Sequence, residues 1–476
     1  MGVLIGLDIG TTKLCAAALD SSSGRMMAVE DAPNDSRVES APGVAEQDAG
    51  SIAGKSLALL ARLSSRPEIR QSEVVGIGVT GQMHGVVVVD SAANPVTPLV
   101  TWQDGRGTAE YSTSGRSYAE ELAHRLGDEA LKASGCGPAT GYGAVTLLRM
   151  KEEGCLPAGA TALTIHDLIV RVLCGAAVTD PTDAASWGIF DVRHGSRWLP
   201  EALDALSLPD GMLPGVVPTG SVAGGLLPDV AQRIDLPYGT PVAAALGDNQ
   251  ASFMGSVPSM SESVLLSLGT GGQMSAPIGR FARADGLDTR PLVAGQWLLV
   301  GASLCGGRAY EILEKFFAGV GSSLFDAGGT ERLYDRMNRL AADADEECGV
   351  LTASTLFEGS RLDPGARGSI ANVSGANFTV GNLTRAVIKG MVAELAAFLD
   401  CARRAGAVPK FCSGSGNAVR RNIVVRNEIQ KQVGMTLRMP PHPEEAAVGA
   451  ALAAGIATGV YADWTAAGKT LFGEGF

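Results

Sequence analysis

The chain has 476 residues, a length that favours two or more domains over a single core. Hydrophobic residues make up 46% and charged residues 18%, a composition typical of folded globular proteins and not of disordered chains. The formal net charge of -12 leaves no basic surplus to neutralise phosphates, so we expect neither nucleic acid nor an anionic membrane as a partner.

Eight cysteines are scattered without a C-x-x-C pair, which argues against a zinc site and against a dense disulfide framework. No apolar stretch approaches the roughly 20 residues that span a bilayer. The N-terminal apolar run contains Asp8 and lacks a basic segment before it, unlike a signal peptide. We therefore expect a cytoplasmic protein with reduced thiols.

The first predicted elements are two strands, residues 3–8 and 14–19, joined by a tight turn into a hairpin. The turn lies in "LDIGTTK", residues 7–13, where the amides and hydroxyls of Gly10, Thr11 and Thr12 suit a phosphate group. Asp8 places a carboxylate beside the same turn. A phosphate site with its own negative charge needs a further explanation.

A similar turn recurs in the second half of the chain. The apolar run 264–268 leads into Gly269 and Thr270 within "LSLGTGG", which matches "LDIGTTK" at the first Leu and at the Gly-Thr pair. Ser267 stands where the first turn has Asp8. The match predicts two related domains that face one ligand, with two coincidental glycine hairpins as the alternative.

Between and after these turns, strands alternate with helical segments, which indicates an α/β fold. We expect a helix at 51–63, strands at 74–80, 86–89 and 242–246, and a domain boundary that separates residues 1–249 from 250–476. The second half is expected to contain a helix at 383–403, a strand near Phe411, a helix at 418–430 and a small-residue helix at 446–454.

Asp248 follows the predicted strand 242–246 in "LGDNQAS". Open α/β sheets bind ligands beyond the carboxyl ends of their strands, and a carboxylate there can take the proton from a hydroxyl that attacks phosphorus. The alternative is that Asp248 only caps the next helix.

Two further segments have the composition of a polyol site. "GQMHG" places His84 after a strand, where its ring could exchange one hydrogen bond with a sugar, although a lone histidine is often structural. "TWQDGR" gathers Trp102, Asp104 and Arg106 in one turn, as in sugar sites, but also as in a surface turn with an internal ion pair. The five histidines show no metal-ligand spacing.

"SGSGN", residues 413–417, lies between a strand and a helix, so its amides face whatever approaches the helix N-terminus. Neither a G-x-x-x-x-G-K-[ST] loop nor a correctly placed G-x-G-x-x-G motif is present, which disfavours P-loop and dinucleotide-binding folds.

Taken in order, these segments resemble the FGGY carbohydrate kinases. "GLDIGTTK" is similar to the first phosphate motif of that family, "LSLGTGG" to the second, "SGSGN" to the adenosine motif and "EEAAVGAA" to the following helix. The resemblance implies two actin-like (ribonuclease H-like) ATPase domains with a cleft between them that holds ATP and a sugar.

The resemblance also implies roles for individual residues. Asp248 would be the catalytic base, and Asp8 would hold Mg²⁺, which accounts for its charge beside the phosphates. The sugar would contact Met83, His84, Trp102, Asp104 and Asp248. ATP would contact Gly10, Thr11, Thr12, Gly269, Thr270, Gly301, Gly414 and Asn417.

The implied reaction is phosphorylation of a ketose by Mg-ATP, with D-sedoheptulose favoured by the tryptophans of "TWQDGR" and "AASWG" and D-xylulose second. Two alternatives come from other classes: a sugar-responsive binding protein without catalysis, and an ATPase without a sugar acceptor. A homodimer is a further possibility that the resemblance leaves open.

Overall fold

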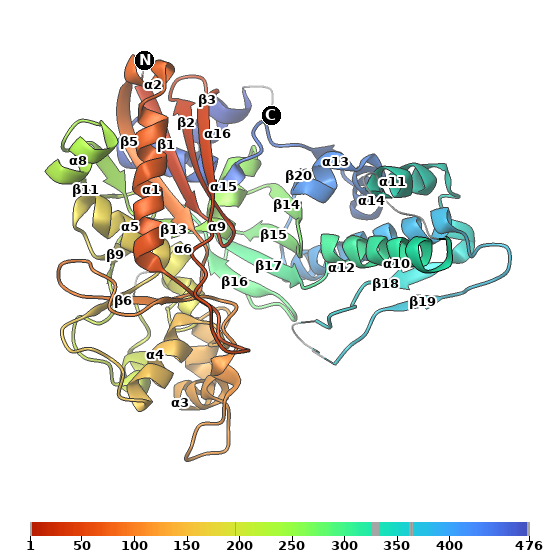
Figure 1. Ribbon diagram of the computed structural model, residues 1–476, viewed down its shortest axis with the longest axis horizontal. Helices are drawn as coiled ribbons and strands as arrows, with labels where there is room; N and C mark the ends of the chain where they lie inside the picture. The colour runs from red at the N-terminus through yellow and green to blue at the C-terminus, as the bar shows by residue number, and fades with distance from the viewer. Residues whose placement is uncertain (1, 196, 326–332, 361–362, 364, 474–476) are drawn as a thin grey trace. The chain divides into compact units, whose positions relative to one another are not determined.

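The computed structural model describes residues 2–195, 197–325, 333–360, 363 and 365–473. These residues form two compact units (Figure 1). Unit 1 comprises Met1–Met260, Thr289–Trp297 and Glu444–Phe476, and unit 2 comprises Ser261–Asp288 and Leu298–Pro443. The chain therefore enters and leaves each unit more than once. The sequence-based domain limits, 1–249 and 250–476, stay a prediction.

Unit 1 is built on one large sheet in which β1 (Gly2–Ile9) lies between β2 (Lys13–Asp20) and β5 (Glu73–Gly81). Strand β1 runs antiparallel to β2, which confirms the predicted hairpin, and parallel to β5. The strand order is β11-β12-β5-β1-β2-β3, and β13 (Leu246–Gly247) pairs with the end of β5. The edge strands of this order are β3 (Met26–Pro33) and β11 (Val222–Gly225), and β12 (Pro241–Ala243) lies between β11 and β5.

Helix α15 (Glu445–Ala457) lies directly against β1 and β5 in unit 1. A Cβ on Gly6 would come within 1.8 Å of the Ala447 carbonyl oxygen, and one on Gly78 within 1.9 Å of the Ala450 carbonyl oxygen. The backbones of helix and sheet therefore touch because both sides carry small residues. The predicted small-residue helix is confirmed, and it belongs to unit 1 although the chain reaches it only after unit 2.

The remaining helices and short strands of unit 1 surround this sheet. Helix α1 begins after Asp48, whose side chain accepts a hydrogen bond from the amide of Ser51. The elements are β4 (Glu46–Gln47), α1 (Ala49–Ser64), α2 (Pro67–Arg70), β6 (Val87–Val89), β7 (Leu99–Val100), α3 (Tyr118–Ala133), α4 (Gly143–Glu152), β8 (Thr161–Leu163), α5 (Ile165–Cys174), β9 (Val178–Thr179), α6 (Pro181–Ala184), α7 (Pro200–Leu206), β10 (Gly215–Val216), α8 (Pro228–Ile234), α9 (Asp248–Ser256) and α16 (Trp464–Phe472).

Unit 2 repeats the central strand arrangement of unit 1. Strand β14 (Ser263–Leu268) runs antiparallel to β15 (Gly272–Ile278) and parallel to β20 (Phe411–Ser415). Strands β17 (Trp297–Ser303) and β21 (Leu437–Arg438) lie outside these, in the order β17-β15-β14-β20-β21. The predicted repeat of a strand, a glycine turn and a returning strand is thus confirmed in the topology of both units.

The longest helix of unit 2, α12 (Val380–Ala405), confirms the helix predicted at 383–403. The single helix predicted at 418–430 is wrong, because the chain forms α13 (Asn417–Arg421) and α14 (Ile423–Val433) with a break at Asn422. The Asn422 side chain accepts from the amides of Val424 and Val425 and so starts a new helix. The other elements near this unit are β16 (Asp288–Pro291), α10 (Gly307–Phe325), α11 (Leu333–Asp343), β18 (Thr352–Ser354) and β19 (Ser369–Ala371).

The strand predicted at 242–246 is also only partly correct. The chain forms β12 and β13 there, separated by Ala244 and Ala245. All eight cysteines are free thiols, as expected from their spacing. In the part of the chain that the structure describes, no helix has the length and apolar character to cross a bilayer.

Candidate active site

The turn between β1 and β2 is held by hydrogen bonds that leave little room for a side chain. The Gly10 amide donates to the Lys13 carbonyl oxygen at 3.0 Å, and a Cβ on Gly10 would lie 2.7 Å from that oxygen. Asn34 donates from Nδ2 to the Gly10 carbonyl oxygen at 2.8 Å. Glycine is therefore required at the tightest point of the turn.

Thr11 is part of a polar cluster that reaches beyond the turn. Its hydroxyl donates to Gln82 Oε1 at 3.1 Å, and its carbonyl oxygen accepts from Gln47 Nε2 at 3.0 Å. Gln82 in turn donates to Gln47 Oε1 at 2.8 Å. Sequence reasoning missed both glutamines, although Gln82 lies inside "GQMHG". Thr12 is exposed beside this cluster.

Asp8 lies near the end of β1 in a region of concentrated negative charge. Burial raises the pKa of its carboxyl to about 7, and the nearby charges of Asp248 and Glu444 act in the same direction, while Lys13 opposes them. Lys13 Nζ lies 2.9 Å from the Glu444 carboxylate. A divalent cation would relieve this repulsion, and Mg²⁺ commonly binds through one or two carboxylates together with phosphates.

The described residues contain no group of three or more histidine, cysteine, aspartate or glutamate side chains that could hold a metal ion alone. The surroundings of Asp8 therefore fit a cation that is shared with a phosphate ligand, and they do not fit an all-protein cage.

Asp248 is the first residue of α9, and it does not cap that helix. The N-cap is Gly247, which makes no side-chain capping bond. Burial raises the pKa of Asp248 to about 6, and the charges of His166 and Arg290 oppose this rise. Asp248 is therefore not the N-cap of α9, and a carboxylate whose pKa is raised towards neutrality is chemically able to accept a proton.

Met83 and His84 of "GQMHG" have different surroundings. Met83 is buried, and its Cε would lie 2.7 Å from a Cβ placed on Gly247. His84 has a φ of 75°, in the left-handed region that non-glycine residues rarely adopt. Its ring stacks on Tyr142 with centroids 4.1 Å apart, and Nδ1 lies 2.7 Å from the Ser186 carbonyl oxygen. Because a carbonyl oxygen can only accept, Nδ1 donates this bond.

The sequence left two interpretations of the "TWQDGR" turn, a sugar site and a turn with an internal ion pair. The structure contains the ion pair. Asp104 is buried and accepts from Arg106 Nε at 2.9 Å and from the Ala45 amide at 3.0 Å. Arg106 also reaches Glu46 at 2.5 Å. Trp102 differs, because 46% of it is exposed while its indole N–H donates to the Thr11 hydroxyl. Sugar contact by Asp104 stays a prediction.

In unit 2, three glycine segments meet at the second turn. The Gly307 amide donates to the Gly269 carbonyl oxygen at 2.8 Å, and the Arg308 amide donates to the Thr270 carbonyl oxygen at 2.9 Å. A Cβ on Gly416 would lie 2.4 Å from the Leu268 carbonyl oxygen. The start of α10 and the end of "SGSGN" thus pack against the turn through backbone atoms.

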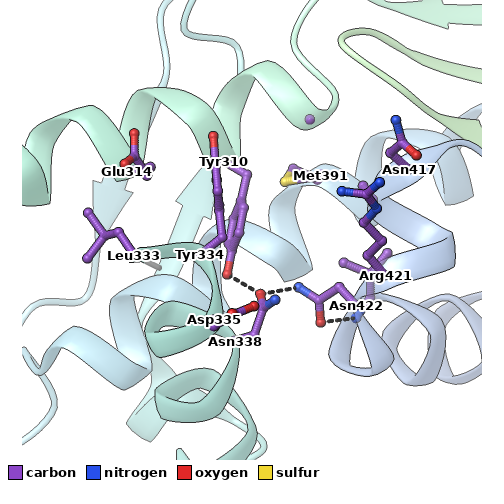
Figure 2. Close-up of a pocket in the computed structure, with 13 residues that line it drawn as sticks. Tyr310, Glu314, Leu333, Tyr334, Asp335, Asn338, Met391, Asn417, Arg421 and Asn422 are labelled. Atoms are coloured by element: carbon purple, nitrogen blue, oxygen red, sulfur yellow. Dashed lines mark hydrogen bonds between the residues drawn. The ribbon is translucent and has the colours of Figure 1, made fainter. Parts of the chain in front are cut away.

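A pocket of about 500 Å³ opens in unit 2 beside these segments (Figure 2). Asn417, predicted to approach the nucleotide, is one of the residues that line it. Gly414 and Gly301 are not among them. A Cβ on Gly301 would lie 2.3 Å from the Phe398 ring, and one on Gly414 would lie 2.9 Å from Val419. Both glycines therefore allow close packing beneath the surface.

Two tyrosines and three asparagines are among the residues that line this pocket. The rings of Tyr310 and Tyr334 are stacked, as Figure 2 shows. Their centroids are 5.7 Å apart. The Tyr310 hydroxyl and Asn422 Nδ2 both donate to Asn338 Oδ1, at 2.6 and 2.7 Å. Flat rings beside fixed amides suit a planar heterocycle. Sequence reasoning missed Tyr310 and Asn338, because no motif surrounds them.

Comparison with known proteins decides the family. Residues 3–255 match the N-terminal domain of the FGGY family of carbohydrate kinases, and residues 266–458 match its C-terminal domain. The chain belongs to the FGGY family of carbohydrate kinases. As an FGGY kinase it is a phosphotransferase that uses ATP to phosphorylate a sugar.

Individual relatives of this FGGY kinase differ in substrate. It is 32% identical to human sedoheptulokinase, across 94% of this chain and 96% of that one. It is 27% identical to a glycerol kinase of Trichlorobacter lovleyi, across 97% and 91%. The crystal structure of xylulose kinase from Rhodospirillum rubrum aligns with a TM-score of 0.85 at 24% identity, across 98% and 92%. The predicted actin-like, ribonuclease H-like fold of two domains is confirmed.

Proposed function

We propose that this FGGY kinase transfers the γ-phosphoryl group of ATP to D-sedoheptulose and forms sedoheptulose 7-phosphate. The observation that supports catalysis most directly is Asp248, a carboxylate with a raised pKa that caps no helix. The choice of D-sedoheptulose rests on the similarity to human sedoheptulokinase, which extends over nearly the full length of both chains.

In the proposed reaction Asp248 accepts the proton of the sugar hydroxyl as that oxygen forms its bond to the γ-phosphorus. The bond between the γ-phosphorus and the bridging oxygen breaks, and ADP leaves with the electron pair. The base contributes a factor of about 10² to 10⁴, since phosphoryl transfer depends mainly on positioning and on neutralisation of charge. Trp102, His84, Met83 and Asp104 are the proposed sugar contacts.

Asp8 is the proposed ligand of Mg²⁺, either directly or through water. The cation, when bound, neutralises charge on the phosphates during transfer. The negative charges of Asp248 and Glu444 near Asp8 support this assignment, because they favour a bound cation. Gly10, Thr11 and Thr12 in unit 1, and Gly269 and Thr270 in unit 2, are the proposed phosphate contacts.

The unit 2 pocket is the proposed binding site of the adenosine group. Its stacked tyrosines suit an adenine ring, and Asn417 lies at the N-terminus of α13 in its lining. Gly414 and Gly301 are proposed to support this site through the packing described above. We further propose a cytoplasmic location and leave a homodimer as a possible assembly.

The second candidate is D-xylulose. A xylulose kinase of Staphylococcus xylosus is 26% identical to this chain across 82% of it, and the two ketoses share most hydroxyl positions that a site could contact. An ADP-release assay with both ketoses at equal concentrations separates the candidates. Faster turnover of D-sedoheptulose is expected, while faster turnover of D-xylulose would overturn the choice.

The same assay tests the candidates from other classes. ATP hydrolysis without sugar, at a rate equal to the rate with sugar, would favour an ATPase. Sugar binding without any phosphorylated product would favour a binding protein. We expect product formation that depends on both the ketose and ATP.

A further inference from the structure

Two buried threonine hydroxyls hold the Leu246–Gly247 peptide group, which lies one residue before Asp248. Thr80 Oγ1 donates to the Leu246 carbonyl oxygen at 2.7 Å, and the Gly247 amide donates to Thr182 Oγ1 at 3.0 Å. That carbonyl and that amide belong to the same peptide group, and in a trans peptide they point in opposite directions. Side chains therefore fix this peptide plane from two sides.

Asp180 fixes the direction of the Thr182 hydroxyl. One carboxylate oxygen of Asp180 accepts from Thr182 Oγ1 at 2.7 Å, and the other accepts from Thr219 Oγ1 at 2.6 Å. An ionised carboxylate can only accept, so the Thr182 proton points towards Asp180. The lone pairs of Thr182 Oγ1 are then available to the Gly247 amide. Thr80, Thr182 and Asp180 are all fully buried, so water does not compete for these bonds.

The position before Asp248 needs such support because it is a glycine. Glycine has the widest backbone freedom, and here Met83 lies where a side chain would go. Gly247 also makes no capping bond that would fix the start of α9. The pairing of β13 with β5 covers only Leu246 and Gly247. The two hydroxyls add to this short pairing and further restrict rotation of the Leu246–Gly247 peptide, which would redirect the Asp248 carboxylate.

We propose that Thr80 and Thr182 form a clamp on the Leu246–Gly247 peptide and so position the Asp248 carboxylate for proton transfer. Neither threonine is proposed to touch the sugar or ATP, so both are positioning residues. The inference rests on the proposed role of Asp248 as the base. A displacement of about 1 Å at a reacting group can cost about 10²-fold in rate, so a clamp of this kind affects kcat before it affects binding.

The test removes each hydroxyl while keeping the shape of the side chain. Thr80→Val and Thr182→Val are each expected to lower kcat about tenfold to 100-fold, with KM for ATP and for the ketose changed less than about threefold. Thr80→Ser and Thr182→Ser retain the hydroxyl and are expected to stay within about threefold of wild-type kcat. Thr240→Val is the matched control, since Thr240 is a buried threonine whose hydroxyl donates to the Pro237 carbonyl oxygen in a turn.

A double-mutant cycle with Asp248→Asn separates positioning from general damage. If Thr182 acts through Asp248, Thr182→Val is expected to lower single-turnover rates in the wild-type background and to have little effect in the Asp248→Asn background. Equal losses in both backgrounds would overturn the clamp. A folded Thr→Ser variant whose kcat falls more than tenfold would also overturn the clamp. This second criterion can be applied even if the Thr→Val variants fail to fold.

These outcomes remain distinct from failure of the proposed function. Normal turnover by Asp248→Asn would remove the proposed base itself, whatever the threonine variants do. A large loss in Asp248→Asn together with unchanged kcat in folded Thr80→Val and Thr182→Val would retain the base and reject the clamp. The assays use whichever ketose the full-length protein turns over fastest, so the choice of substrate does not affect the result.

Discussion

The indole nitrogen of Trp102 lies 3.2 Å from the Thr11 hydroxyl, to which it donates a hydrogen bond. The bond connects the exposed aromatic residue of the "TWQDGR" turn with the glycine turn after β1. Thr11 also donates to Gln82, so the proposed sugar and phosphate contacts share one hydrogen-bonded cluster. The position of the Trp102 indole is therefore coupled to that of the Thr11 hydroxyl.

Substitutions of Trp102 can separate the contribution of its indole N–H group from that of its aromatic face. Trp102→Phe keeps an aromatic face but removes the N–H group, and loss of one such bond is expected to lower kcat/KM about two- to tenfold. Trp102→Ala removes the face as well, and KM for the ketose should rise by a further tenfold or so. Steady-state kinetics with each substrate varied in turn provides the measurement. Equal effects of the two substitutions would contradict a role for the aromatic face.

Asp248→Asn removes the proposed base with little change in volume. We expect kcat to fall at least about 10²-fold, because an amide cannot accept the proton from the sugar hydroxyl. Nucleotide affinity, measured by calorimetry with ADP, should change little. A variant with normal turnover would eliminate Asp248 as the base.

The pH dependence should report the raised pKa of Asp248. A base must be deprotonated to act, so kcat/KM is expected to fall as the pH drops below about 6, the pKa of this carboxyl. Saturating Mg²⁺ should be present throughout, so that Asp8 remains ionised. In Asp248→Asn the residual activity should lack this acidic limb. If the fall in activity at acidic pH persists unchanged in Asp248→Asn, that fall must come from a titratable group other than Asp248.

Asp8→Ala should raise the requirement for Mg²⁺. The half-saturating Mg²⁺ concentration is expected to increase at least about tenfold, while KM for the ketose stays nearly constant, because the carboxylate is proposed to hold the cation and not the sugar. An unchanged Mg²⁺ dependence in Asp8→Ala would exclude the proposed metal role.

Tyr310→Ala should weaken nucleotide binding. Stacking of a base on an aromatic ring contributes about 1–3 kcal/mol, so Kd for ADP is expected to rise about tenfold or more. Tyr310→Phe keeps the ring but loses the bond to Asn338, and a smaller effect is expected. Calorimetry on the full-length protein measures both. Normal ADP affinity in Tyr310→Ala would place the adenosine group outside this pocket.

The glycine turns, the strands that flank them and Asp248 could be predicted because their signals are local. The "LDIGTTK" and "LSLGTGG" segments contain their strand, turn and polar groups within seven residues each. The long helix at α12 was equally clear from its apolar period.

Features that depend on distant residues could not be predicted in this way. Gln47 and Thr182 lie far from the segments that they support, and no local pattern singles them out. The break at Asn422 arises because a capping side chain competes with continuation of the helix, a choice that apolar periodicity does not record. The pocket residues Tyr310 and Asn338 come together only through packing of α10 and α11.

The contact of α15 with Gly6 and Gly78 has a consequence for biosynthesis. The N-terminal sheet emerges from the ribosome first, yet the helix that covers β1 and β5 is translated only after all of unit 2. During that interval the glycine-lined face of the sheet lacks its cover, and a nascent chain that stops before Glu444 cannot complete unit 1. Such stalled or truncated chains should therefore depend on chaperones and be degraded rapidly, whereas the finished chain completes both units at nearly the same time.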